Sequence, residues 1–79
     1  MSPTLFRQKG FRFYFFSREE PRMHVHVQAE DGEAKFWLEP GVELARNHGL
    51  PAAALSELQR MIEDRFDEIV NAWRRHFGA

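Results

Sequence analysis

The sequence predicts an α+β fold, in which three or four antiparallel strands form a meander and a long C-terminal helix packs on one face of the sheet. Two observations lead to this prediction. Aromatic and β-branched residues alternate with polar ones in the first half of the chain, at the period of two that a half-buried strand requires. Beyond Pro51, apolar residues recur every three or four positions, which is typical of a helix with one buried side.

The chain has 79 residues, the size of one small domain, and we expect residues 1–79 to fold as a single unit. A domain near this size buries only about 60–65% of its unfolded surface, so its core is thin. Eight phenylalanines and two tryptophans supply bulk that small aliphatic residues could not. The lack of cysteine excludes a disulfide framework and a thiolate metal cage.

Targeting signals and overall charge suggest no membrane partner. No signal peptide or long apolar run is visible, so we expect a cytoplasmic protein of bacterial type. The formal net charge of −1 gives no overall attraction to nucleic acid or to an anionic membrane. Charge is uneven, however, because segment 7–22 is mainly basic and the middle of the C-terminal segment is mainly acidic. A local anion site and a simple solvated surface are both compatible with this pattern.

The first two strands are expected over residues 10–16 and 22–29. The first contains the run Phe-Arg-Phe-Tyr-Phe-Phe, which suits a pleated sheet, and the polar loop 17–21 follows it. In the second, apolar and polar residues alternate strictly. This alternation places Met23, Val25, Val27 and Ala29 on one side of the strand, and His24, His26 and Gln28 on the other.

The dipeptide Asp31-Gly32 predicts a tight turn into a third strand over residues 34–39, because a type I′ turn needs positive φ at both central positions. Such a turn fixes the register. It sets Val27 opposite Phe36 on the apolar side. On the polar side it sets His26 opposite Trp37, and His24 opposite Glu39.

The remaining elements follow from Val42 onward. Residues 42–45 fit a short fourth strand or one helical turn, and the strand is the favoured interpretation. Residues 52–77 are expected to be helical, with Pro51 in the first turn and Gly78 as a stop signal. Such a helix would be about 40 Å long at about 1.5 Å per residue. We expect it to kink or break near Asp64, or to overhang the sheet and help to form a dimer.

The polar side of the second and third strands carries the candidate site. Residues two apart on a strand point the same way, so the imidazoles of His24 and His26 can converge. With Glu39 opposite, the set His24, His26 and Glu39 supplies the ligand types of a zinc or non-haem iron site. His-x-His alone is a weak motif, however, and the third ligand depends on the predicted register.

A second interpretation needs no metal. Imidazole exchanges protons near neutral pH, so His24 and His26 could divide the acid and base roles on a phosphodiester. The candidates for holding a phosphate are Arg12, Arg18, Arg22 and Lys35, and those for stacking a base are Tyr14 and Trp37. A third interpretation is purely structural, with the histidines as ordinary cross-strand partners of aromatic and acidic side chains. His48 and His76 give no signal of their own.

The first strand suggests a protein partner. Phe11, Phe13 and Phe15 fall on one side of it, and Tyr14 and Phe16 fall on the other. One helical layer covers only one side, so the second aromatic set needs another chain, or the N-terminal segment with Leu5 and Phe6, to cover it. We favour an interface, either with a partner protein or within a homodimer.

Four segments resemble a bacterial family known as domain of unknown function 4160. They are FFSREEPRMHVHV, GEAKFWLEP, VELARNHGL and AWRRHFG, and the most distinctive element is Pro-x-x-His-Val-His-Val from Pro21 to Val27. The resemblance runs from about Thr4 to Gly78. Arg22 and Met23 stand where many relatives have a further proline, and Pro51 stands where they usually have a serine cap.

The resemblance implies a small α+β protein whose gene commonly neighbours that of another small family, domain of unknown function 2442. Such pairs are regarded as toxin–antitoxin modules, with this family on the toxin side, and no catalytic mechanism comes with the resemblance. We therefore expect a toxin-like component that a partner protein neutralises, with His24 and His26 as candidate catalytic residues. The candidate binding residues are Trp37, Glu39, Lys35, Tyr14 and Arg22. The alternatives are a non-enzymatic binding module and a small metal protein.

Overall fold

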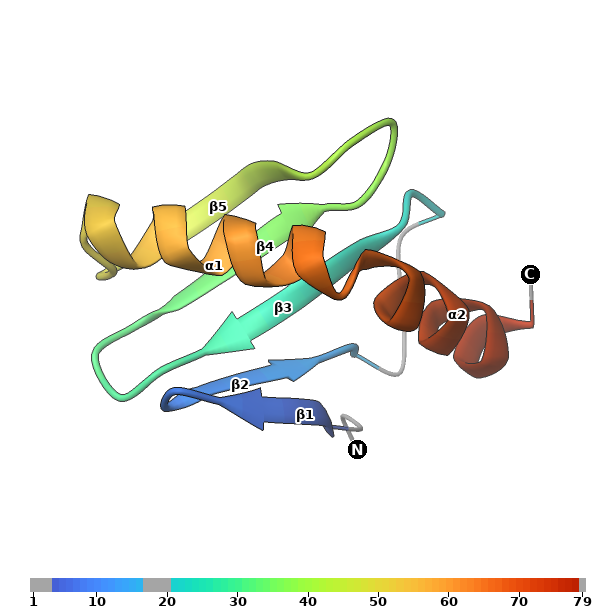
Figure 1. Cartoon of the computed structure of the whole chain (residues 1–79), viewed down its shortest axis with the longest axis horizontal. Coiled ribbons are helices and arrows are strands. Elements are labelled where there is room, and N and C mark those ends of the chain that lie inside the picture. Colours follow the sequence, from blue (N-terminus) through green and yellow to red (C-terminus); the bar gives the residue numbers. More distant parts are fainter. Residues whose placement is uncertain (1–3, 17–20, 79) are drawn as a thin grey trace.

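The computed structural model describes residues 4–16 and 21–78, and it has the α+β architecture that the sequence predicts. Five strands form one antiparallel meander in the order β1-β2-β3-β4-β5, one or two more strands than predicted, and two helices follow (Figure 1). The strands are β1 (Thr4–Gln8), β2 (Phe11–Tyr14), β3 (His24–Gln28), β4 (Glu33–Trp37) and β5 (Glu43–His48). The helices are α1 (Ala52–Asp64) and α2 (Phe66–Phe77).

Strand β1 is the element that the sequence did not predict. Its pattern is hard to read because Leu5 and Phe6 are adjacent, and a shift of register between Thr4 and Phe6 accommodates them. The strand is held by its cross-strand neighbour in β2, since the ring of Phe6 stacks on that of Phe13 at 4.4 Å. The turn that follows has φ of 52° at Lys9 and 82° at Gly10, as a type I′ turn requires.

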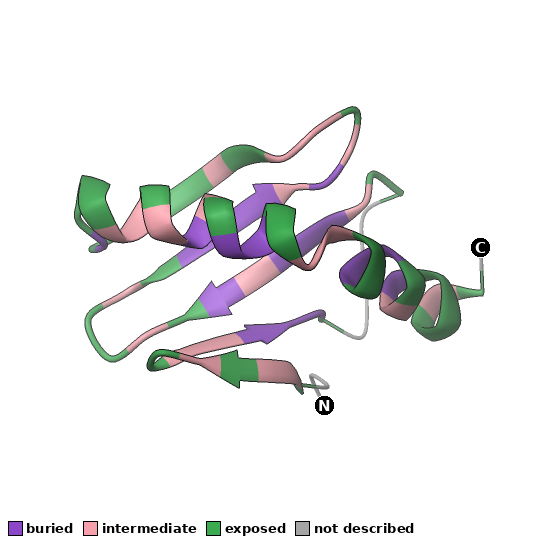
Figure 2. Ribbon diagram, in the orientation of Figure 1, coloured by how far each residue is buried: buried purple, intermediate pink, exposed green. Residues whose placement is uncertain are grey.

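The core lies between the sheet and the two helices. Helix α1 runs across one face of the sheet and α2 continues beyond the end of β2 (Figure 1), and the buried residues follow the central strands and the inner sides of the helices (Figure 2). The fully buried side chains of β2, β3 and β4 meet those of α1 and α2 there. The largest of these core residues are Phe13, Phe15, Phe36, Leu38, Leu58, Ile62 and Ile69.

The expected long helix bends at Arg65, one residue from the predicted position. Arg65 has φ of −111° and separates α1 from α2, but hydrogen bonds continue across it, from its N–H to the Met61 carbonyl and from the Ile69 N–H to its own carbonyl. The bend lets both halves keep their apolar sides on the sheet. At the far end, Gly78 adopts a φ of 71° and donates to the Arg74 carbonyl at 2.8 Å, as the stop signal predicts. Pro51 is the N-cap residue rather than part of the first turn.

The predicted register between β3 and β4 is wrong by two residues. His24 pairs with Trp37 and His26 pairs with Lys35, so the two faces of the sheet are as expected but the cross-strand partners are not. The turn centres on Glu30 and Asp31, since the Ala29 N–H donates to the Gly32 carbonyl at 2.8 Å. Gly32 does not adopt the positive φ of a type I′ turn.

Gly32 is needed for a close approach instead. A β-carbon at this position would lie 2.1 Å from the carbonyl oxygen of His48. The end of β5 therefore passes too near for any side chain, and this contact rather than the turn accounts for the glycine. Within the described part of the chain, neither helix has the length and apolar character to span a membrane.

Candidate functional site

The face of the sheet opposite the helices, called the open face below, carries most of the residues singled out from the sequence. The observed pairings arrange its side chains in three rows across β2, β3, β4 and β5. The rows are Arg12, Gln28, Glu33 and His48; Tyr14, His26, Lys35 and Arg46; and His24, Trp37 and Glu43.

A small hollow of about 110 Å³ lies on the open face. It is lined by Tyr14, Phe16, His26, Glu33, Ala34, Lys35, Arg46 and His48. Among the described residues, two imidazoles, two cationic side chains and a phenol thus surround the open-face hollow, against a single carboxylate. Such a lining suits an anionic ligand.

The two histidines of the His-x-His element lie together but in different environments. Their ring centroids are 5.0 Å apart and the rings are nearly perpendicular. His24 is fully buried, and its ring packs at 5.3 Å against Trp73 of α2. Its Nδ1 donates to the carbonyl oxygen of Arg22 at 2.8 Å. By its pairing His24 belongs to the open-face side of β3, but its ring is buried against α2 instead of being presented away from the helices, as had been expected for both imidazoles. Only His26 of the pair lines the open-face hollow.

His26 belongs to an aromatic cluster that extends from β2. The ring of Tyr14 stacks on that of His26 at 5.4 Å, and the ring of Phe16 lies 4.2 Å from it. The guanidinium of Arg12 also lies over the Tyr14 ring, 4.4 Å from its centroid. Tyr14 is buried, whereas Phe16 is 45% exposed. Only Phe16 of this cluster thus offers a large area of ring to a ligand.

Trp37 is flanked by two cations. The guanidinium of Arg22 and the ammonium of Lys35 lie 4.2 and 4.4 Å from the centre of its ring. These cation–π contacts occupy the indole surface that the sequence suggested for stacking a base. Lys35 is only 7% exposed and nevertheless lines the open-face hollow.

Glu39 does not join the histidines. Its carboxylate accepts a hydrogen bond from the Met23 N–H at 2.8 Å, and its carbonyl accepts one from the Arg22 side chain at 2.9 Å. Among the residues that the structure describes, no three histidine and acidic side chains are grouped so that they could hold a metal ion. The predicted set of His24, His26 and Glu39 is therefore not assembled. Arg18, a candidate for holding phosphate, lies outside the described residues.

The sequence did not single out Arg46 or His48, although both line the open-face hollow. In a regular strand Arg46 would share a side with Leu44. A shift of register between Lys35 and Phe36 instead pairs Arg46 with Lys35 and Leu44 with Phe36. This β-bulge turns Arg46 onto the open face. The sequence feature that could have pointed to these two residues is the run Arg-Asn-His, which carries basic and imidazole side chains.

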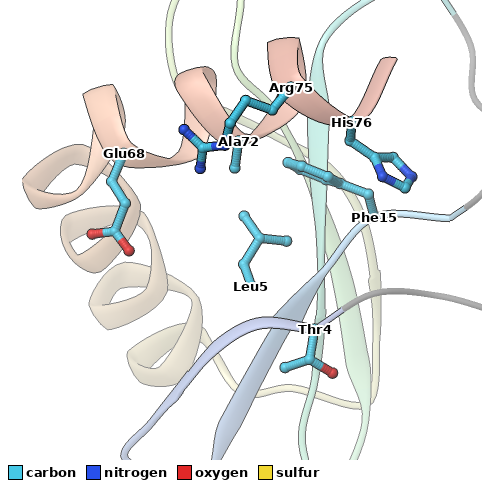
Figure 3. A pocket seen from close by; sticks show the side chains of 7 residues that line it. All are labelled: Thr4, Leu5, Phe15, Glu68, Ala72, Arg75 and His76. Carbon is cyan, nitrogen blue, oxygen red and sulfur yellow. The ribbon is translucent and has the colours of Figure 1, made fainter. Parts of the chain in front are cut away.

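A second cavity lies on the helix side, between α2 and the first two strands (Figure 3). It measures about 420 Å³, and its lining includes Leu5, Phe15, Glu68, Arg75 and His76. Arg75 and Glu68 both extend from α2 over the cavity (Figure 3). No residue that the structure describes lines both this cavity and the open-face hollow.

Comparison with protein families now adds to this geometry. The model of a family described as domain of unknown function (DUF4160) matches residues 10–74. The chain belongs to this family. The match includes every residue of the open-face hollow, so the hollow lies within the part that defines a DUF4160 domain. Comparisons with curated proteins and with solved structures give no match.

Proposed function

We propose that this DUF4160 protein is the toxin-side component of a two-gene module. It acts through the open face, and a partner protein, encoded by a neighbouring gene of the domain of unknown function 2442 type, neutralises it by covering that face. Family membership motivates the proposal, because such gene pairs are what the resemblance implies. The single structural observation in its favour is the chemistry of the open face, which gathers imidazole, cationic and aromatic side chains around one hollow.

The physical basis for a protein partner is the mixture of side chains on this face. Interface cores are enriched in aromatic residues and arginine, and a few such side chains carry most of the binding energy. Phe16 is 45% exposed and sits beside His26 at 4.2 Å, while Arg22 and Arg46 are exposed nearby on the same face. A partner that buries Phe16 would remove apolar surface from water and close the hollow at the same time.

The test is a growth assay with inducible expression, with and without the neighbouring gene. We expect expression alone to slow growth and co-expression to restore it. The variant His26→Ala should relieve the growth defect, and Phe16→Ala should weaken the complex with the partner. The matched controls are His76→Ala and Phe77→Ala, which are both on α2 and are not among the residues that line the open-face hollow.

Two results would overturn the proposal. If the wild-type protein does not affect growth, the protein is not a toxin. If both Phe16→Ala and a second open-face variant, Arg46→Glu, bind the partner as the wild type does, the open face is not the docking surface. If the partner binds but growth never changes, the protein is a non-enzymatic binding module. Size-exclusion chromatography of the protein alone shows whether it forms a homodimer.

A further inference from the structure

We infer that the open-face hollow binds the phosphate group of a nucleotide, either free or within single-stranded RNA, with Phe16 contacting the base. The inference rests on the proposed function, because it names the ligand class of the same surface. It goes further by replacing the histidine pair that the sequence suggested: His26 and His48, from β3 and β5, line the hollow, and His24 does not.

The charge of the lining favours an anion. Lys35 and Arg46 are cationic side chains, and two imidazoles add hydrogen-bond donors. Among the lining residues that the structure describes, Glu33 is the single carboxylate. Arginine and lysine are the residues that proteins use most to hold phosphate, because they donate several charge-assisted hydrogen bonds.

Lys35 makes the hollow more than a cationic surface. It lies in the middle row of the sheet between His26 and Arg46, and it is only 7% exposed. A charge at a site with little water acts through a lower effective dielectric, so its attraction for an anion is stronger than that of a solvated lysine. The contact of its ammonium with Trp37 at 4.4 Å further orients it.

The volume of the hollow and the aromatic ring beside it indicate which kind of anion it binds. The volume of about 110 Å³ is several times that needed to hold one water, so it admits a phosphate group with its four oxygens. Phe16, 45% exposed, forms part of the lining and presents an aromatic ring beside it. A phosphate next to an exposed ring is what a nucleotide requires, since every base has a π-face that can stack on an aromatic side chain. An acidic peptide would use the cations but not the ring.

Binding is measured by NMR titration of the full chain with three probes: inorganic phosphate, 5′-AMP and a seven-nucleotide single-stranded RNA. We expect all three to shift the amide signals of His26, Lys35 and Arg46. Arg46→Ala should weaken the binding of each probe about tenfold, as the loss of one charge-assisted contact to phosphate implies. Phe16→Ala should weaken 5′-AMP and RNA but leave inorganic phosphate unchanged, and tighter binding of RNA than of 5′-AMP would identify RNA as the source of the nucleotide.

The cavity of Figure 3 supplies matched controls, since it is also lined by an arginine and a histidine. Arg75→Ala and His76→Ala make the same changes of charge as Arg46→Ala and His48→Ala. If both pairs lower affinity equally, binding is a general effect of surface charge and the inference is wrong. Tighter binding of a hexaglutamate peptide than of RNA would also overturn it, in favour of a protein ligand.

The folded state of each variant is checked from its amide spectrum, and Arg46→Lys, which keeps the charge, should retain most of the affinity. The outcome is separable from that of the proposed function. Absence of phosphate binding together with normal complex formation with the partner would refute only the nucleotide site. Loss of the growth effect with intact phosphate binding would refute only the toxin role.

Discussion

The two faces of the sheet are built from the same strands but are packed in different ways. On the helix-covered face, Val25, Val27 and Phe36 meet the apolar sides of α1 and α2. On the open face, the side chains between them pack on one another, with Tyr14 and Lys35 only 7% exposed. The difference teaches that burial alone does not identify the core in so small a domain. Here a second buried layer consists of polar, aromatic and cationic groups.

Adjacent residues of β4 give the largest expected contrast between the faces. Phe36 is 1% exposed in the core, whereas Trp37 lies on the open face between Arg22 and Lys35. Phe36→Ala should lower the free energy of unfolding by about 3–5 kcal/mol, because it leaves a cavity among packed side chains. Trp37→Ala should cost less, about 1–2 kcal/mol, since it removes cation–π contacts and partly buried area.

Urea titration at 25 °C measures both changes. Phe36→Leu, a smaller change, keeps the comparison measurable if Phe36→Ala does not fold. Equal losses at the two positions would mean that both faces contribute alike to stability.

Substitutions of His24 and His26 compare a fully buried and a half-buried position within β3. His24→Ala should lower the free energy of unfolding by about 2–3 kcal/mol, because His24 is fully buried against Trp73 and donates to the Arg22 carbonyl. His26→Ala should cost about 1 kcal/mol, since His26 is half-buried and loses mainly ring contacts. Thermal unfolding followed by circular dichroism gives the order. If His26→Ala is the more damaging of the two, His24 is not the structural member of the pair.

The sequence allowed both faces of the sheet to be predicted, because period-two alternation depends only on local geometry. The same holds for the helical region after Pro51, whose apolar spacing and stop at Gly78 are local signals, and for the bend near Asp64, which follows from the length of the helix relative to the sheet. A strand near residues 42–45 was also expected, and β5 occupies Glu43–His48.

The register and the hollow could not be predicted, because both depend on contacts between distant segments. Gly32 appeared to be a turn residue, but the carbonyl oxygen of His48 lies where its β-carbon would be. Arg46 reaches the open face only through the bulge opposite Lys35 and Phe36, which leaves no periodic trace in the sequence. The burial of His24 likewise depends on Trp73, almost fifty residues further along the chain.

Gly32 lies against the backbone of His48, whose side chain lines the hollow. Its substitution should lower the free energy of unfolding by less than His24→Ala does. Gly32→Ala forces the backbone of His48 to move, and we expect a loss of about 1–2 kcal/mol in the free energy of unfolding, as in other overpacked sites. Gly41→Ala is the matched control, since a β-carbon there has no neighbour within 4 Å. It should leave stability unchanged or raise it by up to about 1 kcal/mol through the unfolded state.

Amide spectra of the two glycine variants show where the change acts. Gly32→Ala should shift the signals of β4 and β5 and weaken phosphate binding, because His48 and Arg46 follow the displaced strand. A variant as stable as wild type, with unshifted β5 signals, would contradict the assigned close approach.

The smallest effect is expected from an ion pair that connects the β1–β2 turn to α1. Lys9 Nζ lies 3.2 Å from the Glu57 carboxylate, but the two side chains are 63% and 41% exposed. Exposed pairs contribute about 0–1 kcal/mol and are screened by salt. A double-mutant cycle with Glu57→Gln and Lys9→Gln should therefore give a coupling below about 0.5 kcal/mol, which disappears in about 1 M salt. A larger, salt-independent coupling would mean that charge as well as apolar packing holds the helices on their face of the sheet.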